Sequence, residues 1–298
     1  ADLVLVAGVE GQTTVSARVG GDYLARAAHY RRQRDIDDFT FPALFAQRIK
    51  AYRERYGLDD EDLGRIAVKA YENANRNPKA HMHSRRLSLD HAAAASERNP
   101  NFLGNADLNP FLKITDCSQV SDGGSAILLC SPEGLAKLGK QESDVVEIKG
   151  RGHAVSSLYE DGDPTELTTV SAAIHQAYAE AGIGVGDLGV AEVHDCFTVA
   201  ELLTYEAMGL AAAGDGAAVV RSGRTALDGD LPTNTGGGLI GFGHPVGATG
   251  VKQPLEIFRQ MKGLCSDYQV AGSPAWGLTS NMGGDDKTVV ALTIQNCE

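Results

Sequence analysis

Apolar positions along this chain change their spacing from segment to segment, and the changes predict strands that alternate with helices. Short apolar runs bounded by turn residues predict strands within DLVLVAGVE, SAILLC, VVEIKGRGHAV, LGVAEV, WGLTSN and TVVALTIQ. Apolar residues at helical spacing lie between them, within FPALFAQRIKAYRERYG, DDEDLGRIAVKAY, SPEGLAKLG, PTELTTVSAAIHQAYAEAGIG, TVAELLTYEAMG and the segment that ends at Met261. This alternation predicts an α/β fold with buried sheets.

The first strand has apolar residues on both faces and no polar residues leading into it. A strand of this kind needs neighbours on both sides. The chain therefore reads as though it starts in the middle of a domain. We expect residues 1–10 to form a central strand whose neighbour comes from another segment or another chain. An edge position with both faces solvated would contradict this expectation.

Residues 20–110 differ in character from the rest, because amphipathic helices dominate them. One predicted helix carries Leu44, Phe45, Ile49, Tyr52 and Tyr56 on one face, and the next carries Leu63, Ile66, Ala67 and Ala70. A polar and locally basic segment follows at residues 72–86. We interpret this block as a helical insertion between two strands of a first domain.

Composition narrows the class of protein. The 298 residues suffice for about two domains, and 43% of them are hydrophobic. A net charge of −12 without a long basic block argues against nucleic-acid binding, and no apolar run is long enough for membrane insertion. The five cysteines are widely spaced and form no CxxC pair, which argues against a disulfide framework or a metal site and for a reducing compartment.

The segment AEVHDCF places His194, Asp195 and Cys196 where a predicted strand ends and a helix begins. Ligands of open α/β sheets bind at the carboxyl ends of strands, and a helix N-terminus favours a thiolate. Cys196 is therefore a candidate catalytic thiol. The alternative is a buried cysteine that packs as a small hydrophobe beside a core histidine.

Two further loops are candidates. GFGHPVG holds His244 before a proline and among glycines, which allow close approach of a backbone or a substrate. Its spacing is not that of a dinucleotide-binding motif, and a structural turn is the alternative. NMGG, at residues 281–284, could aim backbone N–H groups at an oxyanion or form an ordinary hairpin turn.

HDCF, GHPVGATG and NMGG, in this order, resemble the thiolase superfamily and in particular its sterol-carrier-protein-2-type branch. TDCSQVSDGGSAILL resembles the loop and strand that end the first half of these proteins. The resemblance implies two similar α/β halves packed as five α-β-α-β-α layers. Residues 1–135 would be an incomplete first half with the loop-domain insertion, and residues 143–298 a complete second half.

The resemblance also implies a nucleophilic cysteine before the first strand, and no such residue stands in this sequence. Cys117 and Cys130 lie in segments that resemble later elements, so neither replaces it. We expect the nucleophile to come from an N-terminal segment or from a partner subunit.

The resemblance implies roles in a reversible Claisen condensation and its thiolytic reverse. His244 would accept the proton of the nucleophile and line the first oxyanion hole, which His194 completes. Cys196, with His244 as its near partner, would be the second acid/base. The N–H of Gly283 would serve the second oxyanion hole, and Phe197 would pack beneath the loop.

Coenzyme A would enter as a substrate rather than as a permanently bound cofactor. Ser118 aligns with a serine that contacts the pantetheine arm in the family. Arg76, Lys79, Arg85 and Arg86 are candidates for the phosphates of coenzyme A, with a solvated surface as the alternative. The resemblance further implies a homodimer or tetramer and a place in lipid metabolism, such as fatty acid β-oxidation. The compartment would be the bacterial cytoplasm, or the mitochondrial or peroxisomal matrix of a eukaryote.

Three other functions stay open at this point. A thiolase-fold aldolase or acyltransferase subunit could act with a partner protein, although it has less need of the HDCF thiol. A cysteine hydrolase would use Cys196 as nucleophile and His244 as base. The last alternative is a non-catalytic fragment that binds coenzyme A.

Overall fold

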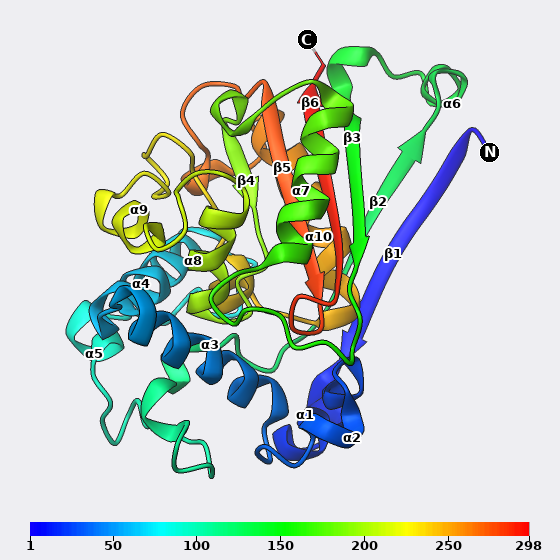
Figure 1. Cartoon of the computed structure of the whole chain (residues 1–298). Coiled ribbons are helices and arrows are strands. Elements are labelled where there is room, and N and C mark those ends of the chain that lie inside the picture. The colour runs from blue at the N-terminus through cyan, green and yellow to red at the C-terminus, as the bar shows by residue number, and fades with distance from the viewer. Residues whose placement is uncertain (298) are drawn as a thin grey trace.

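The computed structural model describes residues 1–297, which form successive β, α, β and α layers (Figure 1). A two-stranded antiparallel ribbon pairs β1 (Leu3–Gly11) with β2 (Asp122–Cys130). A four-stranded sheet has the order β3-β6-β5-β4. Its strands are β3 (Val146–Val155), β4 (Val190–Glu192), β5 (Trp276–Gly283) and β6 (Thr288–Asn296). Only the β4–β5 pair is parallel.

Helices cover both faces of the sheet (Figure 1). Helix α7 (Thr168–Ala181) packs on β3 and β6, and α10 (Val246–Met261) lies between the sheet and the ribbon. Glycines permit both approaches. A Cβ at Gly152 of β3 would overlap the carbonyl oxygen of Ala173, and a Cβ at Gly8 of β1 would overlap that of Gly247. These two glycines therefore allow α7 to pack closely on the sheet and α10 to pack closely on the ribbon.

The predicted helical insertion lies between β1 and β2. It contains α1 (Ala17–Leu24), α2 (Tyr30–Gln33), α3 (Thr40–Tyr56), α4 (Asp60–Arg76) and α5 (Leu89–Ala93). The apolar residues predicted to face inward on α3 and α4 are buried, except that Tyr56 is partly exposed. Both helices pack against α8 (Thr198–Ala207), which directly follows the HDCF segment. The insertion is thus one body with the second half, around a shared core.

The remaining helices are α6 (Pro132–Lys137), with Ser131 as its cap, and α9 (Gly216–Ser222). Among the helices of residues 1–297, none combines the length and the apolar character that a membrane crossing requires.

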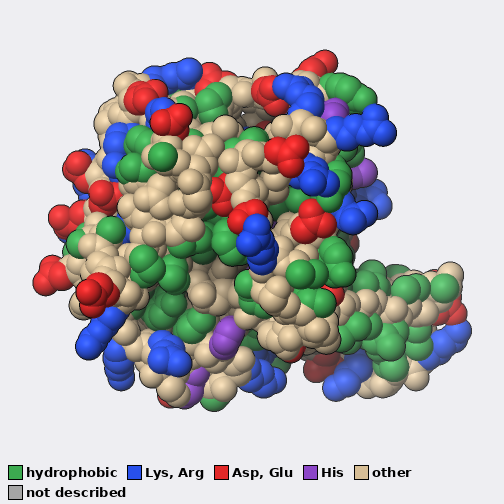
Figure 2. Space-filling model, turned by 90° about the horizontal axis from the view of Figure 1, so that it is seen from below, with side chains coloured by type: hydrophobic (Ala, Val, Ile, Leu, Met, Phe, Trp, Pro, Cys, Tyr) green, Lys and Arg blue, Asp and Glu red, His purple; other side chains and the backbone are tan. Residues whose placement is uncertain are grey.

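Within residues 1–297, β1 is an edge strand that is covered on one face only, so the neighbour expected for residues 1–10 stays a prediction. Leu5 and Val9 of β1 are 70% and 80% exposed, and Leu128 of β2 is 49% exposed. One face of the ribbon packs on α10, while its other face and the outer edge of β1 are open. Figure 2 shows the far end of the ribbon, with α6, projecting from the body with hydrophobic side chains on it. The dimer remains a prediction, and a monomer by light scattering at micromolar concentration would contradict it.

Candidate active site

The three loops singled out in the sequence meet at the carboxyl ends of the parallel strands β4 and β5. His194 follows β4, Met282 lies at the end of β5, and His244 stands two residues before α10. The rings of His194 and His244 pack edge to face, with their centroids 5.0 Å apart. The backbone N–H of Met282 donates to Nδ1 of His194 over 3.3 Å. Residues distant in the sequence therefore share one site.

The partners of His194 fix its tautomer. Because Nδ1 accepts the N–H of Met282, the proton of the neutral ring lies on Nε2. Burial, with the neighbouring His244 ring, holds the pKa of His194 well below its ordinary value. A neutral ring with Nε2–H is a hydrogen-bond donor, which is what an oxyanion hole requires.

The partners of His244 place its proton on the other ring nitrogen, Nδ1. Its Nδ1 lies 2.7 Å from the hydroxyl of Thr249, and that hydroxyl donates to the carbonyl of Pro245. Nδ1 is therefore the donor toward Thr249, and Nε2 keeps its lone pair. Burial lowers the pKa of His244 to about 4. A neutral ring with a free Nε2 lone pair can act as a base.

Asp195 joins the HDCF loop to the glycine-rich loop. Its carboxyl accepts the N–H groups of Leu239 and Ile240 over 2.7 and 3.3 Å. A Cβ at Gly238 would overlap this carboxyl, so the glycine is required for its approach. Burial, followed by the charge of Glu201, raises the pKa of Asp195. This contact joins the loop of His194 and Cys196 to the glycine-rich loop that carries His244.

Cys196 is buried on the same loop, two residues after His194. Its carbonyl accepts the N–H of Ser118 over 2.9 Å. The next residue, Phe197, is buried and stacks on Phe45 with the centroids 4.4 Å apart, as expected of a side chain beneath the loop. Burial, with the charge of Asp195, raises the pKa of the Cys196 thiol well above its ordinary value. The thiol is thus held protonated, while its pairing with His244 stays a prediction.

The last loop contributes a backbone donor that the sequence does not predict. Gly283 pairs with Thr288 across the β5–β6 ladder, so it lies at the turn between these strands. The backbone N–H that reaches His194 belongs to the preceding residue, Met282. N–H groups point alternately to the two edges of a strand, so one residue decides which group meets the site. The oxyanion role of the Gly283 N–H stays a prediction.

The four bases proposed for coenzyme A lie in and after the end of α4. Arg76, Lys79, Arg85 and Arg86 are all exposed, and within residues 1–297 no carboxylate forms an ion pair with them. The same segment runs along the glycine-rich loop, where His81 N–H donates to the carbonyl of Phe242 over 2.9 Å. The segment that carries the bases therefore lies beside the glycine-rich loop that holds His244.

Two cavities lie elsewhere. One of about 230 Å³ is between α4 and the residues around α9, and one of about 290 Å³ is bordered by residues 227–232 and 271–274. Neither is lined by His194, Cys196 or His244. The expected pocket around these residues, opening toward residues 72–90, therefore stays a prediction.

Acid should destabilise the folded protein through His244. An unfolded histidine titrates near pH 6.5, whereas the pKa of folded His244 is about 4. As the pH falls from 7 to 5, the unfolded chain therefore binds a proton that folded His244 does not bind, and the folded state loses stability relative to the unfolded state. Because the side chain is only half-buried, we expect the loss in unfolding free energy to be about 1 to 2 kcal/mol.

Urea unfolding of the wild type and of His244→Gln at both pH values measures this loss as a difference. The comparison is needed because Asp195, whose pKa is raised, contributes with the opposite sign. An equal pH dependence in the two proteins would contradict the lowered pKa of His244.

The layered α/β fold, with paired histidines and a buried thiol at the strand ends, defines a thiolase-like protein. The family model described as thiolase C-terminal domain-like matches residues 150–294. The acetyl-CoA acetyltransferase of Methanothermobacter thermautotrophicus is 32% identical over 287 residues, which is 96% of this chain and 71% of that protein. Sterol carrier protein 2 of Oryctolagus cuniculus is 33% identical over 256 residues, 84% of this chain and 44% of that protein.

Among solved structures, the Ltp2-ChsH2(DUF35) aldolase superposes with a TM-score of 0.75 at 24% identity, over 99% of this chain and 73% of that chain. This likeness concerns the fold. The chain belongs to the thiolase superfamily and is similar to its sterol-carrier-protein-2 members.

The contacts of three participants were not predicted from the sequence. Thr249 lies one helical turn after His244 in GHPVGATG, which is a signal that could have been used. Asp195 stands between His194 and Cys196, but its contact with the glycine-rich loop has no local signal. Met282 had no signal, because a backbone donor depends on strand alternation rather than on side-chain type.

Proposed function

We propose that this protein is a sterol-carrier-protein-2-type 3-ketoacyl-CoA thiolase, which catalyses thiolytic cleavage and the reverse Claisen condensation. The observation that carries the proposal is the contact of His194 with both His244 and the N–H of Met282. It brings together three loops that resemble thiolase motifs. It leaves Nε2 of His194 as a hydrogen-bond donor and Nε2 of His244 as an acceptor. A base and an oxyanion donor side by side suit acyl transfer.

In the cleavage direction, Nε2 of His244 takes the proton of the nucleophilic cysteine. The resulting thiolate attacks the 3-keto carbon, and the oxyanion accepts the Nε2–H of His194. The bond between C2 and C3 then breaks, and the thiol of Cys196 gives its proton to C2 of the departing acetyl-CoA. The Cys196 thiolate next takes the proton of the incoming coenzyme A thiol. That sulfur attacks the acyl thioester, and the departing nucleophile takes back from His244 the proton that it gave in the first step.

The protonated state of Cys196 favours this reading over a cysteine hydrolase. A hydrolase would need a base that takes the proton of Cys196, because burial raises the pKa of its thiol, and no hydrogen bond joins Cys196 to His244 among the described contacts. An acid that donates to a carbanion needs the proton in place.

A thiolase-fold aldolase that works with a partner is the second candidate. The superposition on the Ltp2-ChsH2(DUF35) aldolase favours it, since that name includes a second protein. The two functions separate when the protein at its natural length is given each of two substrates. A thiolase converts 3-ketoacyl-CoA to two thioesters only when coenzyme A is added, whereas an aldolase cleaves a 3-hydroxyacyl-CoA to an aldehyde or ketone and a shorter acyl-CoA without added coenzyme A.

We expect the exposed bases to bind the phosphates of coenzyme A. The double substitution Arg85→Glu and Arg86→Glu replaces two positive charges with two negative ones, and we expect the Kd for coenzyme A to rise roughly tenfold or more at low salt. Isothermal titration at two salt concentrations measures it. Lys137→Glu with Lys140→Glu, near α6, makes the same change in charge away from the site and should leave Kd unchanged. Equal effects of the two pairs would indicate a general charge effect and contradict the assignment.

A further inference from the structure

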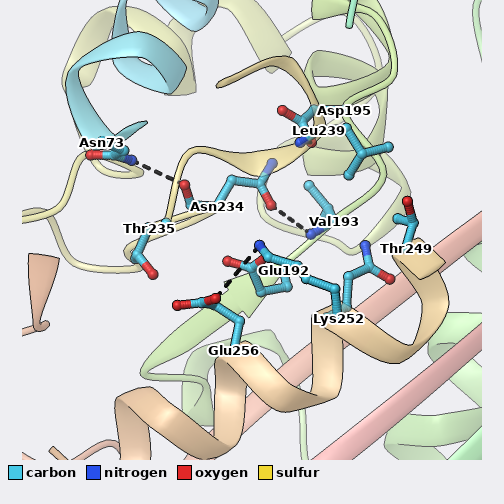
Figure 3. A network of polar contacts seen from close by, with 12 residues as sticks. Asn73, Glu192, Val193, Asp195, Asn234, Thr235, Leu239, Thr249, Lys252 and Glu256 are labelled. Carbon is cyan, nitrogen blue, oxygen red and sulfur yellow. Dashed lines mark hydrogen bonds and ion pairs between the residues drawn. The ribbon is translucent and has the colours of Figure 1, made fainter. Parts of the chain in front are cut away.

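Asn234 is a buried residue that the proposed mechanism does not use, yet all its polar groups are engaged. It has no exposed surface, and its backbone is left-handed, with φ of 57°. Its backbone N–H donates to the carbonyl of Ala191 over 2.9 Å, and its carbonyl accepts Nδ2 of Asn73 over 3.1 Å. Its side-chain Oδ1 accepts the N–H of Val193 over 2.9 Å, and Nδ2 donates to Glu201 over 2.8 Å. Figure 3 shows Asn234 between Asn73 and Val193.

The segment before Asn234 serves as a short edge strand for β4. Ala191 N–H donates to the carbonyl of Pro232 over 3.0 Å, and Ala191 pairs with Thr233 in a parallel bridge. In a parallel ladder of this register, the next donor, Val193 N–H, would meet the backbone carbonyl of Asn234. The left-handed turn directs that carbonyl away, toward Asn73, and the side-chain carbonyl of Asn234 takes its place.

Asparagine suits this position for two reasons. It is among the few residues that adopt the left-handed conformation without a large penalty. It also carries an acceptor for Val193 and a donor for Glu201 on one planar group. Glu201 is fully buried and paired with Lys69 of α4, so its carboxylate is held as the acceptor.

The contact with Val193 lies directly before the candidate catalytic loop. Farther along, the carboxyl of Asp195 is held by Leu239 and Ile240, and the carbonyl of Cys196 by Ser118. At the start of the loop, the side chain of Asn234 holds Val193 through its hydrogen bond. Val193 is fully buried, so loss of this acceptor would leave an unpaired N–H in the core.

We propose that Asn234 is a positioning residue, which completes the β4 ladder with its side chain and so sets where the loop from His194 to Cys196 begins. Its effect on catalysis rests on the proposed function, but its effect on the loop does not. Removing the side chain lets the loop open more often without unfolding the rest of the protein.

The reactivity of the Cys196 thiol measures the opening of the loop. Methyl methanethiosulfonate modifies thiols, and peptide mass spectrometry assigns the rate to each cysteine. Cys265 is fully buried elsewhere and reports global opening in the same sample. For Asn234→Gly, which keeps the left-handed turn, we expect Cys196 to react about tenfold faster or more while the rate at Cys265 is unchanged.

Asn99→Gly is the matched control. Asn99 is also fully buried, and its Oδ1 accepts the N–H of Thr115 over 3.0 Å while Nδ2 donates to two backbone carbonyls. It does not contact the catalytic loop within the described hydrogen bonds. We expect this variant to lower the melting temperature and to leave the Cys196 rate within about twofold of the wild type.

A charge swap tests the geometry and also serves if Asn234→Gly does not fold. Asn234→Asp places a carboxylate against Glu201 and should speed Cys196 labelling. Adding Glu201→Gln reverses donor and acceptor across the same contact and should restore the rate to within about threefold of the wild type.

Three results would overturn the proposal: no change at Cys196 in the folded Asn234→Gly protein, an equal rise at Cys265, or no rescue by the swap. If labelling behaves as expected and the protein has no thiolase activity, the proposed function fails and the positioning role stands.

Discussion

Cys196→Ala should abolish thiolysis and condensation, with a loss of about a thousandfold or more, while acyl transfer to the nucleophile stays detectable. The proposed mechanism uses Cys196 only to exchange protons with C2 and with the coenzyme A thiol, and His244 activates the nucleophile. A positioned acid/base contributes about 10²–10⁴-fold, so its removal dominates turnover. Steady-state assays measure turnover, and mass spectrometry of the protein after acyl-CoA addition measures acyl transfer.

Cys265→Ala is the matched control, because it removes another buried thiol that lies away from the histidines. We expect it to keep wild-type turnover with some loss of stability. If Cys196→Ala also abolishes acyl transfer from acyl-CoA to the nucleophile, Cys196 has a different role, including that of the nucleophile.

His244→Ala should lose both half-reactions, by about a thousandfold each, because no other base then activates the nucleophilic thiol. Thr249→Val is a graded variant. It keeps the imidazole but removes the hydroxyl that holds Nδ1, and we expect a loss of roughly tenfold in kcat with little change in KM.

The substitution His153→Ala removes an exposed histidine from β3 and should leave activity unchanged. If His244→Ala still forms the acyl-enzyme at the wild-type rate, His244 is not the base that the mechanism requires.

The elements of this fold were predictable wherever local pattern determines structure. The inward faces of α3 and α4 follow from apolar residues at helical spacing, and α10 ends at Met261 as the sequence predicts. Burial of the first two strands was not predictable in the same way. Their apolar pattern indicates an environment that these 297 residues supply on one face only.

Some residues of the candidate site could likewise be predicted from local sequence, and others could not. His194, Cys196 and His244 were found because strand ends, glycines and a family resemblance mark them. The N–H of Met282 and the side chain of Asn234 act through contacts made between distant segments. A one-residue shift in register would replace Met282 with Gly283, and nothing in the local sequence specifies that register.

The central claim is that Cys196 exchanges the proton at C2 of the bound thioester. Its most direct test is the incorporation of solvent deuterium at C2 of acetyl-CoA, followed by mass spectrometry in the protein that carries the nucleophile. The account predicts incorporation with the wild type and none above background with Cys196→Ala. Incorporation at the wild-type rate in Cys196→Ala would contradict it.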